Sequence, residues 1–255
     1  FDEIGEVENW QKLINGLRVA YDCDIYITGS NANLLSGELS TYLSGRYVEI
    51  NIYPLSFIEI SNFSKDKNKD ILLEEYLKFG GFPSVYLTGD EEIKASVLKG
   101  IYNSIILKDV SLRGNITQVD LLLKLSLYLL DNMGNSISGT KISNYFKSNN
   151  QKVTPETINR YLQLLENSFI FYKANRYDIR GKEHLKTLGK YYVVDLGLKN
   201  IMLGRMNSNL GNMVENAVYL KLVSDGWNVF VGKYDDLEID FVCFRGEETK
   251  YIQVT

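Results

Sequence analysis

Two short apolar segments near the beginning of the sequence each carry polar residues at their ends. The first is Phe1-Asp2-Glu3-Ile4 and the second is Ile25-Tyr26-Ile27-Thr28-Gly29-Ser30-Asn31, and Trp10–Val19 between them has the spacing of an amphipathic helix. This order predicts the end of one strand, a crossover helix and a second strand. Ligands of open α/β sheets bind at the carboxyl ends of the strands, so we expect a functional site there.

Asp2 and Glu3 form an acidic pair at this edge. Such a pair suits a magnesium nucleotide, because an aspartate can hold the hydrated metal while a glutamate orients the attacking water. The alternative is that both are solvated side chains at a frayed chain start, since a two-residue motif often matches by chance.

Further motifs follow in a fixed order along the chain. They are Trp10, Ile27-Thr28-Gly29-Ser30, Leu34-Leu35-Ser36, Gly45-Arg46-Tyr47 and Tyr53-Pro54-Leu55-Ser56-Phe57. Together with Asp2-Glu3-Ile4, this order resembles the bacterial and archaeal AAA-type predicted ATPases with a C-terminal nuclease-like domain. The resemblance covers almost the whole chain.

The resemblance implies roles for five residues. Asp2 and Glu3 resemble the Walker B pair, with Asp2 on the metal ion and Glu3 on the attacking water. Ser30 and Asn31 look like the sensor at the tip of the next strand, and Arg46 resembles a family arginine near the nucleotide or a neighbouring subunit. The implied cofactors are ATP and Mg²⁺, and the analogy with AAA relatives suggests a homo-oligomer.

One motif of the family is missing from this sequence. A loop of the form G-x-x-x-x-G-K-[ST], whose backbone N–H groups and lysine cradle the phosphates, does not occur in it. In the family this loop lies upstream of the Walker B pair, so the chain is expected to begin inside the ATPase domain. As written, the chain is not expected to bind ATP through a phosphate loop.

The composition bears on where the chain works. Its most apolar segment, Val119–Leu130, contains polar residues and is shorter than the roughly 18 apolar residues of a membrane span, so no membrane partner is expected. Cys23 and Cys243 are far apart and His184 is the only histidine. We therefore expect a reduced, cytoplasmic compartment and no mechanism that needs two histidines.

The charge is unevenly distributed. The net charge is −4, but residues 115–190 contain 11 Lys and Arg against 6 Asp and Glu, which leaves +5 there and −9 in the remainder. A basic middle between acidic flanks indicates a local anionic partner, although a basic excess of this size can equally be a solvated face.

The predicted fold class is α/β, with four units. Residues 1–60 form the C-terminal half of an AAA-type P-loop NTPase core, 61–114 a helical lid, 115–194 a winged-helix domain, and 195–255 a nuclease-like α/β domain that is expected to continue. The first unit contains predicted strands at Ile25–Thr28 and Tyr47–Tyr53, the second predicted helices at Ile71–Phe79 and Glu91–Leu107.

The winged-helix prediction rests on three helices followed by two strands. The helices are expected at Val119–Met133, at Gly139–Lys147 and after Thr154-Pro155, where Thr154 is an N-cap candidate and Pro155 suits the first helical position. The strands are expected at Ser168–Asn175 and Leu188–Val194, with a loop at Asn175–Lys186 between them.

The third helix of a winged helix can enter the DNA major groove. The candidates for DNA contact on or near this helix and the wing are Lys152, Thr157, Asn159, Arg160, Tyr161, Gln163, Lys173, Arg176, Arg180 and Lys182. The alternative is that this unit is only a packing adaptor between its neighbours, because its exposed face is modestly basic. The sequence leaves both interpretations open.

The last unit has the layout of the PD-(D/E)xK nuclease fold. Glu215 lies in a predicted helix at Asn212–Val223, and Asp240 lies in the second of three predicted strands. Carboxylates in this layout converge to hold magnesium for phosphodiester cleavage, so Glu215 and Asp240 are candidate metal ligands. However, Gln253 stands where the motif has Glu, and Thr255 stands where it has Lys, which removes the cation that would stabilise the transition state.

These patterns favour an ATP-binding and hydrolysing AAA-type protein, in its complete form, coupled to a winged-helix and nuclease-like module. The alternative is a DNA-binding adaptor with a degenerate nuclease fold and no catalysis in this chain. A third hypothesis, a defence or toxin-like nuclease, requires Glu215 and Asp240 to be catalytic despite Gln253 and Thr255.

Overall fold

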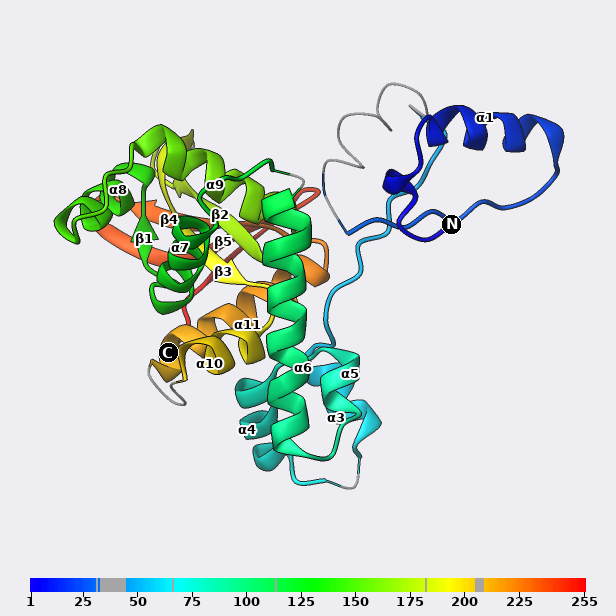
Figure 1. Ribbon diagram of the computed structural model, residues 1–255. Helices are drawn as coiled ribbons and strands as arrows, with labels where there is room; N and C mark the ends of the chain where they lie inside the picture. The colour runs from blue at the N-terminus through cyan, green and yellow to red at the C-terminus, as the bar shows by residue number, and fades with distance from the viewer. Residues whose placement is uncertain (31, 33–44, 66, 113, 182, 205–208) are drawn as a thin grey trace.

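The computed structural model describes residues 1–255 except 31, 33–44, 66, 113, 182 and 205–208. It is a mixed α/β structure with one six-stranded sheet in the order β1-β3-β2-β4-β5-β6. Helices surround this sheet, and the N-terminal segment lies apart from them at the end of an extended stretch of chain (Figure 1). No helix in the described part of the chain is long and apolar enough to cross a membrane.

The N-terminal segment contains the short helix η1 (Ile4–Glu6) and the helix α1 (Trp10–Ala20). Its buried apolar residues, Ile4, Trp10 and Ile14, form a small cluster of their own. The predicted helix is therefore confirmed, and its apolar face is used within this segment rather than against the large sheet.

The strand predicted at Ile25–Thr28 is wrong for the structure as it stands, since these residues are extended but belong to no sheet. They still run beside the chain start in the same direction. The Phe1 amino group donates to the Tyr26 carbonyl (2.7 Å), and the Thr28 N–H donates to the Phe1 carbonyl (2.9 Å). A parallel pair of this kind is stable only when helices and further strands cover both of its faces.

The strand predicted at Tyr47–Tyr53 is also absent from the structure. The segment is extended, and Val48, Ile50 and Ile52 have 87%, 70% and 86% of their surface exposed. The alternation of apolar and polar residues is present, but no strand in the described part of the chain pairs with this segment, and an unpaired strand is not stable alone.

A helical unit follows. It consists of α3 (Phe57–Phe63), α4 (Lys69–Phe79), α5 (Pro83–Tyr86) and the long helix α6 (Glu91–Ser104), which continues as the π-helical turn η3 (Ile105–Leu112). Ser56 caps α3 with a capping box to Glu59, and Asp90 caps α6. The helix predicted at Glu91–Leu107 is thus present and longer, and α3 and α5 were not predicted. In Figure 1, α6 runs from this unit up toward α9.

The end of α4 is fixed by two glycines. Gly80 has φ +75°, and a Cβ atom there would lie 1.8 Å from Asp195 Oδ1. A Cβ atom on Gly81 would lie 1.9 Å from the Leu55 carbonyl oxygen. Only glycine permits this close packing of α4 against Leu55 and Asp195.

The next elements are α7 (Val119–Asp131), β1 (Ser136–Ile137), α8 (Gly139–Ser148), α9 (Pro155–Asn167), β2 (Phe171–Asp178) and β3 (Glu183–Val193). The three predicted helices are confirmed, and Thr154 caps α9 by accepting a hydrogen bond from the Thr157 N–H (3.3 Å). The loop predicted at Asn175–Lys186 is wrong, because β2 and β3 continue through most of it as paired strands with an irregularity between Asn175 and Arg176. The polar side chains of this stretch suggested a loop, but a two-stranded ribbon tolerates them on its exposed face.

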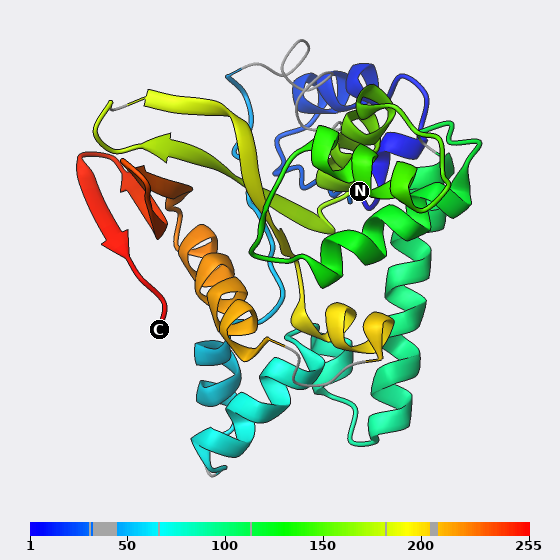
Figure 2. The same cartoon turned by 90° about the vertical axis from the view of Figure 1, so that its left-hand side faces the viewer.

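The last elements are α10 (Leu196–Leu203), α11 (Leu210–Ser224), β4 (Asn228–Tyr234), β5 (Leu237–Arg245) and β6 (Glu248–Ile252). The helix and strands predicted around Glu215 and Asp240 are present, and α10 was not predicted. β2 pairs with β4 in parallel, with Arg176 opposite Val231. The sheet is therefore continuous across the boundary predicted at residue 194, and Figure 2 shows the long β2–β3 hairpin beside α11 and the final strands.

Two buried clusters support this arrangement. The larger one joins the helical unit to α7–α9 and includes Leu122, Leu125 and Ile158, all with 0% exposure. The smaller one packs α11 against the sheet through Tyr192, Tyr219 and Phe241. The rings of Tyr192 and Tyr219 are stacked with centroids 4.2 Å apart.

Candidate functional site

A buried lysine connects carboxylates from two elements of the C-terminal part. Lys190 on β3 places its Nζ atom 2.9 Å from Glu215 Oε1 on α11 and 2.9 Å from Glu238 Oε1 on β5. Lys190 has 4% of its surface exposed and Glu215 8%, whereas Glu238 lies at the solvent edge. We call Lys190, Glu215, Glu238 and Asp240 the lysine–carboxylate cluster.

Asp240 completes the cluster from the same strand as Glu238. Its Oδ1 atom lies 3.7 Å from Lys190 Nζ. Its Oδ2 atom accepts hydrogen bonds from Gln253 Nε2 (2.6 Å) and from the Val254 N–H (2.8 Å). The structure therefore brings together Glu215, Asp240 and Gln253 as predicted, but Gln253 acts as a hydrogen-bond donor to the aspartate.

Two further contacts position Glu215. Tyr192, two residues after Lys190 on β3, donates its hydroxyl to Glu215 Oε1 (2.7 Å). Asn216 exchanges two hydrogen bonds with the Val193 backbone, at 2.9 and 3.0 Å. These contacts fix α11 against β3, so that Glu215 has to face Lys190.

The neighbouring carboxylates stabilise the charged form of Lys190. Burial alone would lower the pKa of Lys190, but the hydrogen bond to Glu238 and the charge of Glu215 outweigh it and raise the pKa above the usual value. Lys190 is therefore an ammonium ion at neutral pH. Burial, and then the nearby charge of Glu215, raises the pKa of Tyr192, so its hydroxyl stays protonated and can donate.

The nuclease-like resemblance implies a magnesium ion at this place, and the residues as arranged do not fit one. An ammonium ion already lies at the centre of the carboxylates, and one oxygen of Asp240 is used by Gln253 and Val254. No group of three or more His, Cys, Asp or Glu residues in the described part of the chain has the arrangement of a metal site. Glu215 and Asp240 meet, but they do so around a lysine.

The first acidic pair lies in the N-terminal segment. Thr28 Oγ1 donates to Asp2 Oδ1 (2.5 Å) and accepts from the Glu3 N–H (3.1 Å). Glu3 has φ 48°, in the left-handed region that non-glycine residues seldom adopt. Asp2 and Glu3 thus lie at the tip of one extended segment, tied to the tip of the next.

The remaining candidates from the ATPase resemblance are Ser30, Asn31 and Arg46. Ser30 follows Thr28 by two residues and is half-buried, and Arg46 is exposed. Asn31 lies outside the described residues. The roles of these residues stay predictions.

Several of the predicted DNA-contact residues already have intramolecular partners. Arg160 Nη2 donates to the Gly114 carbonyl (2.8 Å), and Arg180 forms an ion pair with Asp235 (2.8 Å). Arg176 Nε is buried and has no hydrogen-bond partner among the described residues. Tyr161 is 4% exposed in the core, so the prediction that it reads bases is wrong.

Lys152, Asn159 and Arg160 are exposed near the start of α9, and Arg160 is already bonded to the Gly114 carbonyl. Asn159 also packs on α8, because a Cβ atom added to Gly139 would lie 2.1 Å from its Oδ1 atom. The surface available for DNA at this helix is therefore narrower than the sequence suggested, and its role stays a prediction.

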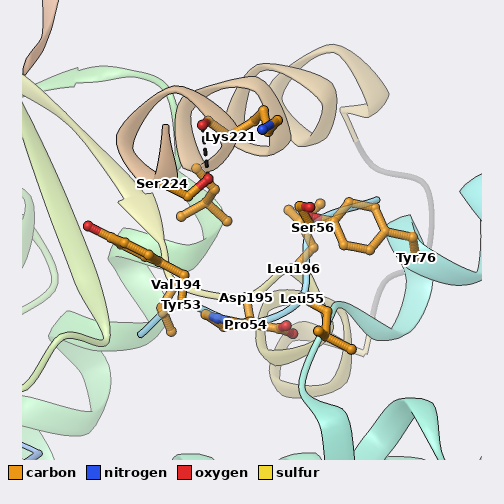
Figure 3. A pocket seen from close by; sticks show the side chains of 11 residues that line it. Tyr53, Pro54, Leu55, Ser56, Tyr76, Val194, Asp195, Leu196, Lys221 and Ser224 are labelled. Carbon is orange, nitrogen blue, oxygen red and sulfur yellow. Dashed lines mark hydrogen bonds between the residues drawn. The ribbon is translucent and has the colours of Figure 1, made fainter. Parts of the chain in front are cut away.

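A pocket lies where residues 53–56 meet α4, α10 and α11 (Figure 3). Asp195, at its base, accepts hydrogen bonds from the Gly81 N–H (2.6 Å) and the Gly197 N–H (2.8 Å). Burial raises the pKa of Asp195 to about 6, although the backbone N–H groups oppose the shift. The free space is about 20 Å³, which is room for about one water molecule and excludes a nucleotide.

The sequence interpretation missed Lys190 and Glu238. A signal for Lys190 was present, because it stands in a strand of otherwise largely apolar residues, as Asp240 does. A buried charge requires a partner of opposite sign, so the two could have been paired. No local pattern indicates that side chains of β3 and β5, which are not neighbouring strands, meet at Lys190.

The fold defines a mixed α/β protein, and its first 61 residues match an AAA domain. This partial match indicates a relationship to the ATPase families. Residues 70–209, more than half of the chain, match the profile of a family described as a domain of unknown function (DUF8612). The chain belongs to that family.

Two relatives match over nearly the whole chain. An uncharacterized protein of Haemophilus influenzae is 49% identical over 257 residues, which cover 99% of this chain and 64% of the relative. Uncharacterized protein MJ1544 of Methanocaldococcus jannaschii is 35% identical over 269 residues, which cover 100% of this chain and 60% of the relative. The chain therefore spans less than two thirds of either relative. No solved structure matches it significantly.

Proposed function

We propose that this chain is part of an ATP-hydrolysing AAA protein, with a C-terminal module that does not cleave nucleic acid. The observation that carries the proposal is that Thr28 ties Asp2 and Glu3 together within the stretch that matches an AAA domain. We place the phosphate loop in the part of the relatives that this chain does not cover.

The two acidic residues would divide the chemistry. Asp2 is exposed, and Thr28 contacts its Oδ1 atom, so its Oδ2 atom would hold a hydrated Mg²⁺ ion. The metal ion would neutralise charge on the phosphates when bound. Glu3 would orient the attacking water and accept its proton, and Ser30 would contact the γ-phosphate.

Glu3→Gln in the full-length protein tests this proposal. The amide keeps the shape of the side chain but cannot accept the proton, so we expect hydrolysis to fall by about 100-fold or more while ATP binding is retained. Glu8→Gln, at an exposed glutamate of the same segment, is the control for the substitution itself and should leave turnover unchanged. Unaltered turnover in Glu3→Gln would contradict the proposal.

A second candidate function is DNA binding by the segment from α7 to β3. The order α7-β1-α8-α9-β2-β3, with β1 and β2 both paired to β3, supports a winged helix. Lys152 is exposed beside the start of α9 and would contact a phosphate. Lys152→Ala should then weaken DNA binding and reduce the salt dependence by about one phosphate contact. Binding that does not change with salt concentration would remove this candidate.

The AAA relationship also leads us to propose self-association of the full-length protein. Arg46 is exposed and would reach the nucleotide of a neighbouring subunit. Arg46→Ala should then lower hydrolysis without lowering ATP affinity, and mixing it with Glu3→Gln subunits should restore some activity. A strictly monomeric protein by light scattering at working concentration would exclude this arrangement.

A further inference from the structure

We infer that Lys190 is a built-in cation that takes the place of a divalent metal ion in the lysine–carboxylate cluster, so that the C-terminal module works without a metal. The inference does not depend on the ATPase proposal. It starts from the disagreement between the nuclease-like layout of Glu215 and Asp240 and the ammonium ion found between them.

The geometry is that of an ion bound by several ligands. Carboxylate oxygens of Glu215 and Glu238 lie at hydrogen-bond distance from Lys190 Nζ, and Asp240 lies slightly farther away. An ammonium group has three donors and no acceptor, so it satisfies these oxygens much as a hydrated cation would. A divalent ion entering the same space would meet a positive charge at its centre.

The cluster also carries an excess of negative charge. One ammonium ion faces three carboxylates, and Glu238 opens the group to solvent while Lys190 and Glu215 are buried. An ion could therefore reach the carboxylates from the Glu238 side if the lysine were absent. The three carboxylates favour a bound cation, and the ammonium group of Lys190 is that cation.

The contacts span distant parts of the sequence. Lys190 comes from β3 of the long β2–β3 hairpin, whereas Glu215 and Asp240 come from α11 and β5. Tyr192 and Asn216 add neutral hydrogen bonds between β3 and α11. The lysine thus fastens the hairpin to the C-terminal elements, a role that a metal ion fills in many small domains.

The wild-type chain gives the first test. Its melting temperature should not change when about 5 mM Mg²⁺, Mn²⁺ or Ca²⁺ replaces EDTA. A metal ion that bound the folded state would raise the melting temperature. A rise in melting temperature with Mn²⁺ that disappears in Glu215→Gln would show a metal ion beside the lysine and would overturn the inference.

Two variants of the lysine separate its charge from its volume. Lys190→Ala removes the ammonium ion and leaves room, and Lys190→Met removes it and fills the space. Both should lower the melting temperature by roughly 6 to 20 °C, because buried carboxylates are left unpaired. Added Ca²⁺ should restore part of this loss in Lys190→Ala and much less in Lys190→Met.

Matched controls keep the test decisive. Lys173→Ala, an exposed lysine on the neighbouring strand β2, should change the melting temperature little and should not respond to Ca²⁺. Combining Lys190→Met with Glu215→Gln should recover part of the stability lost in Lys190→Met. If Lys190→Met melts at the wild-type temperature, or if Ca²⁺ affects Lys190→Ala and Lys190→Met equally, the inference is wrong.

Discussion

Residues 1–52 and residues 57–255 differ in how far their apolar side chains are buried. Among the described residues of the first region, only Ile4, Trp10 and Ile14 form a buried cluster, while Ile52 is 86% exposed. In the second, large clusters are fully buried and Leu125 is 0% exposed. Both regions contain apolar residues at regular spacing, so the difference lies in whether other elements pack against them.

The difference follows from how strands acquire partners. β4, β5 and β6 are joined by short turns and pair antiparallel, so each finds its neighbour within a few residues. The segments at 25–28 and 47–53 would belong to a parallel sheet, whose strands need crossover connections and cover on both faces. Without those neighbours Val48, Ile50 and Ile52 stay exposed, and Ile25 and Ile27 are only half-buried, against the small N-terminal cluster.

Hydrogen exchange should show the largest contrast between the two regions. We expect amides of Phe241–Cys243 to be protected to nearly the full unfolding free energy, on the order of 5 to 15 kcal/mol, and amides of Ile25–Thr28 to be protected by far less. Exchange followed by mass spectrometry measures both in one sample. Equal protection of the two segments would contradict the comparison.

Truncation of apolar side chains should follow the same division. Leu125→Ala should reduce the free energy of unfolding by about 2 to 5 kcal/mol, because it leaves a cavity in α7. Ile52→Ala should change it by less than about 0.5 kcal/mol in this chain. Urea unfolding measures both values.

The same pair sharpens the comparison in the full-length protein. If further strands cover residues 47–53 there, Ile52→Ala should cost roughly 2 kcal/mol or more, while the cost of Leu125→Ala should stay the same. An unchanged small cost for Ile52→Ala would show that this segment is exposed in the longer protein as well.

Asp195 provides a smaller effect with a defined sign. Its pKa is raised from 3.8 to about 6 in the folded chain, so the folded state binds a proton more tightly than the unfolded state. The contribution to stability is fully present below about pH 4 and is lost as the pH rises through 6, by about 3 kcal/mol in total.

Asp195→Asn isolates this contribution. The variant does not titrate, so the stability of wild type minus that of the variant should fall by about 3 kcal/mol between pH 4 and pH 7. The amide keeps one oxygen that can accept, but its NH2 group cannot, so the variant loses one of the two hydrogen bonds from the Gly81 and Gly197 N–H groups and has a lower baseline stability. Urea unfolding at four pH values gives the difference, and a constant difference would contradict the prediction.

Local patterns predicted much of the second region. The nuclease-like layout named Glu215, Asp240 and Gln253; in the structure Gln253 bonds Asp240, and Lys190 lies between Asp240 and Glu215. Local patterns marked the start of α9 at Thr154 and Pro155 and the strand alternation of the last unit. These signals work because a cap or a strand alternation is determined by neighbours in the sequence.

The remainder depended on contacts that no local pattern contains. The strand predicted at 47–53 has the expected alternation but pairs with no strand among the described residues. The loop predicted at 175–186 is mostly a strand pair, because β2 and β3 hydrogen-bond to each other there. The partner of Glu215 is Lys190, 25 residues earlier and on a different element. A charged residue in an apolar segment can be predicted to be buried, but the sequence does not show which residue of opposite charge pairs with it.

Thr28→Val should have a small effect on the free energy of unfolding of this chain. The hydroxyl donates to Asp2 and accepts from the Glu3 N–H, and valine keeps the shape but loses both hydrogen bonds. Because the segment is largely exposed, water replaces the lost partners, and the cost in unfolding free energy should be about 1 kcal/mol or less. Thr88→Val, at a half-buried threonine with one side-chain hydrogen bond, is the control for stability. In the full-length protein the two should separate, since Thr28→Val would loosen the acidic pair and lower ATP hydrolysis while Thr88→Val would not. Equal hydrolysis in both variants would mean that the tie between Asp2, Glu3 and Thr28 holds the chain and has no part in catalysis.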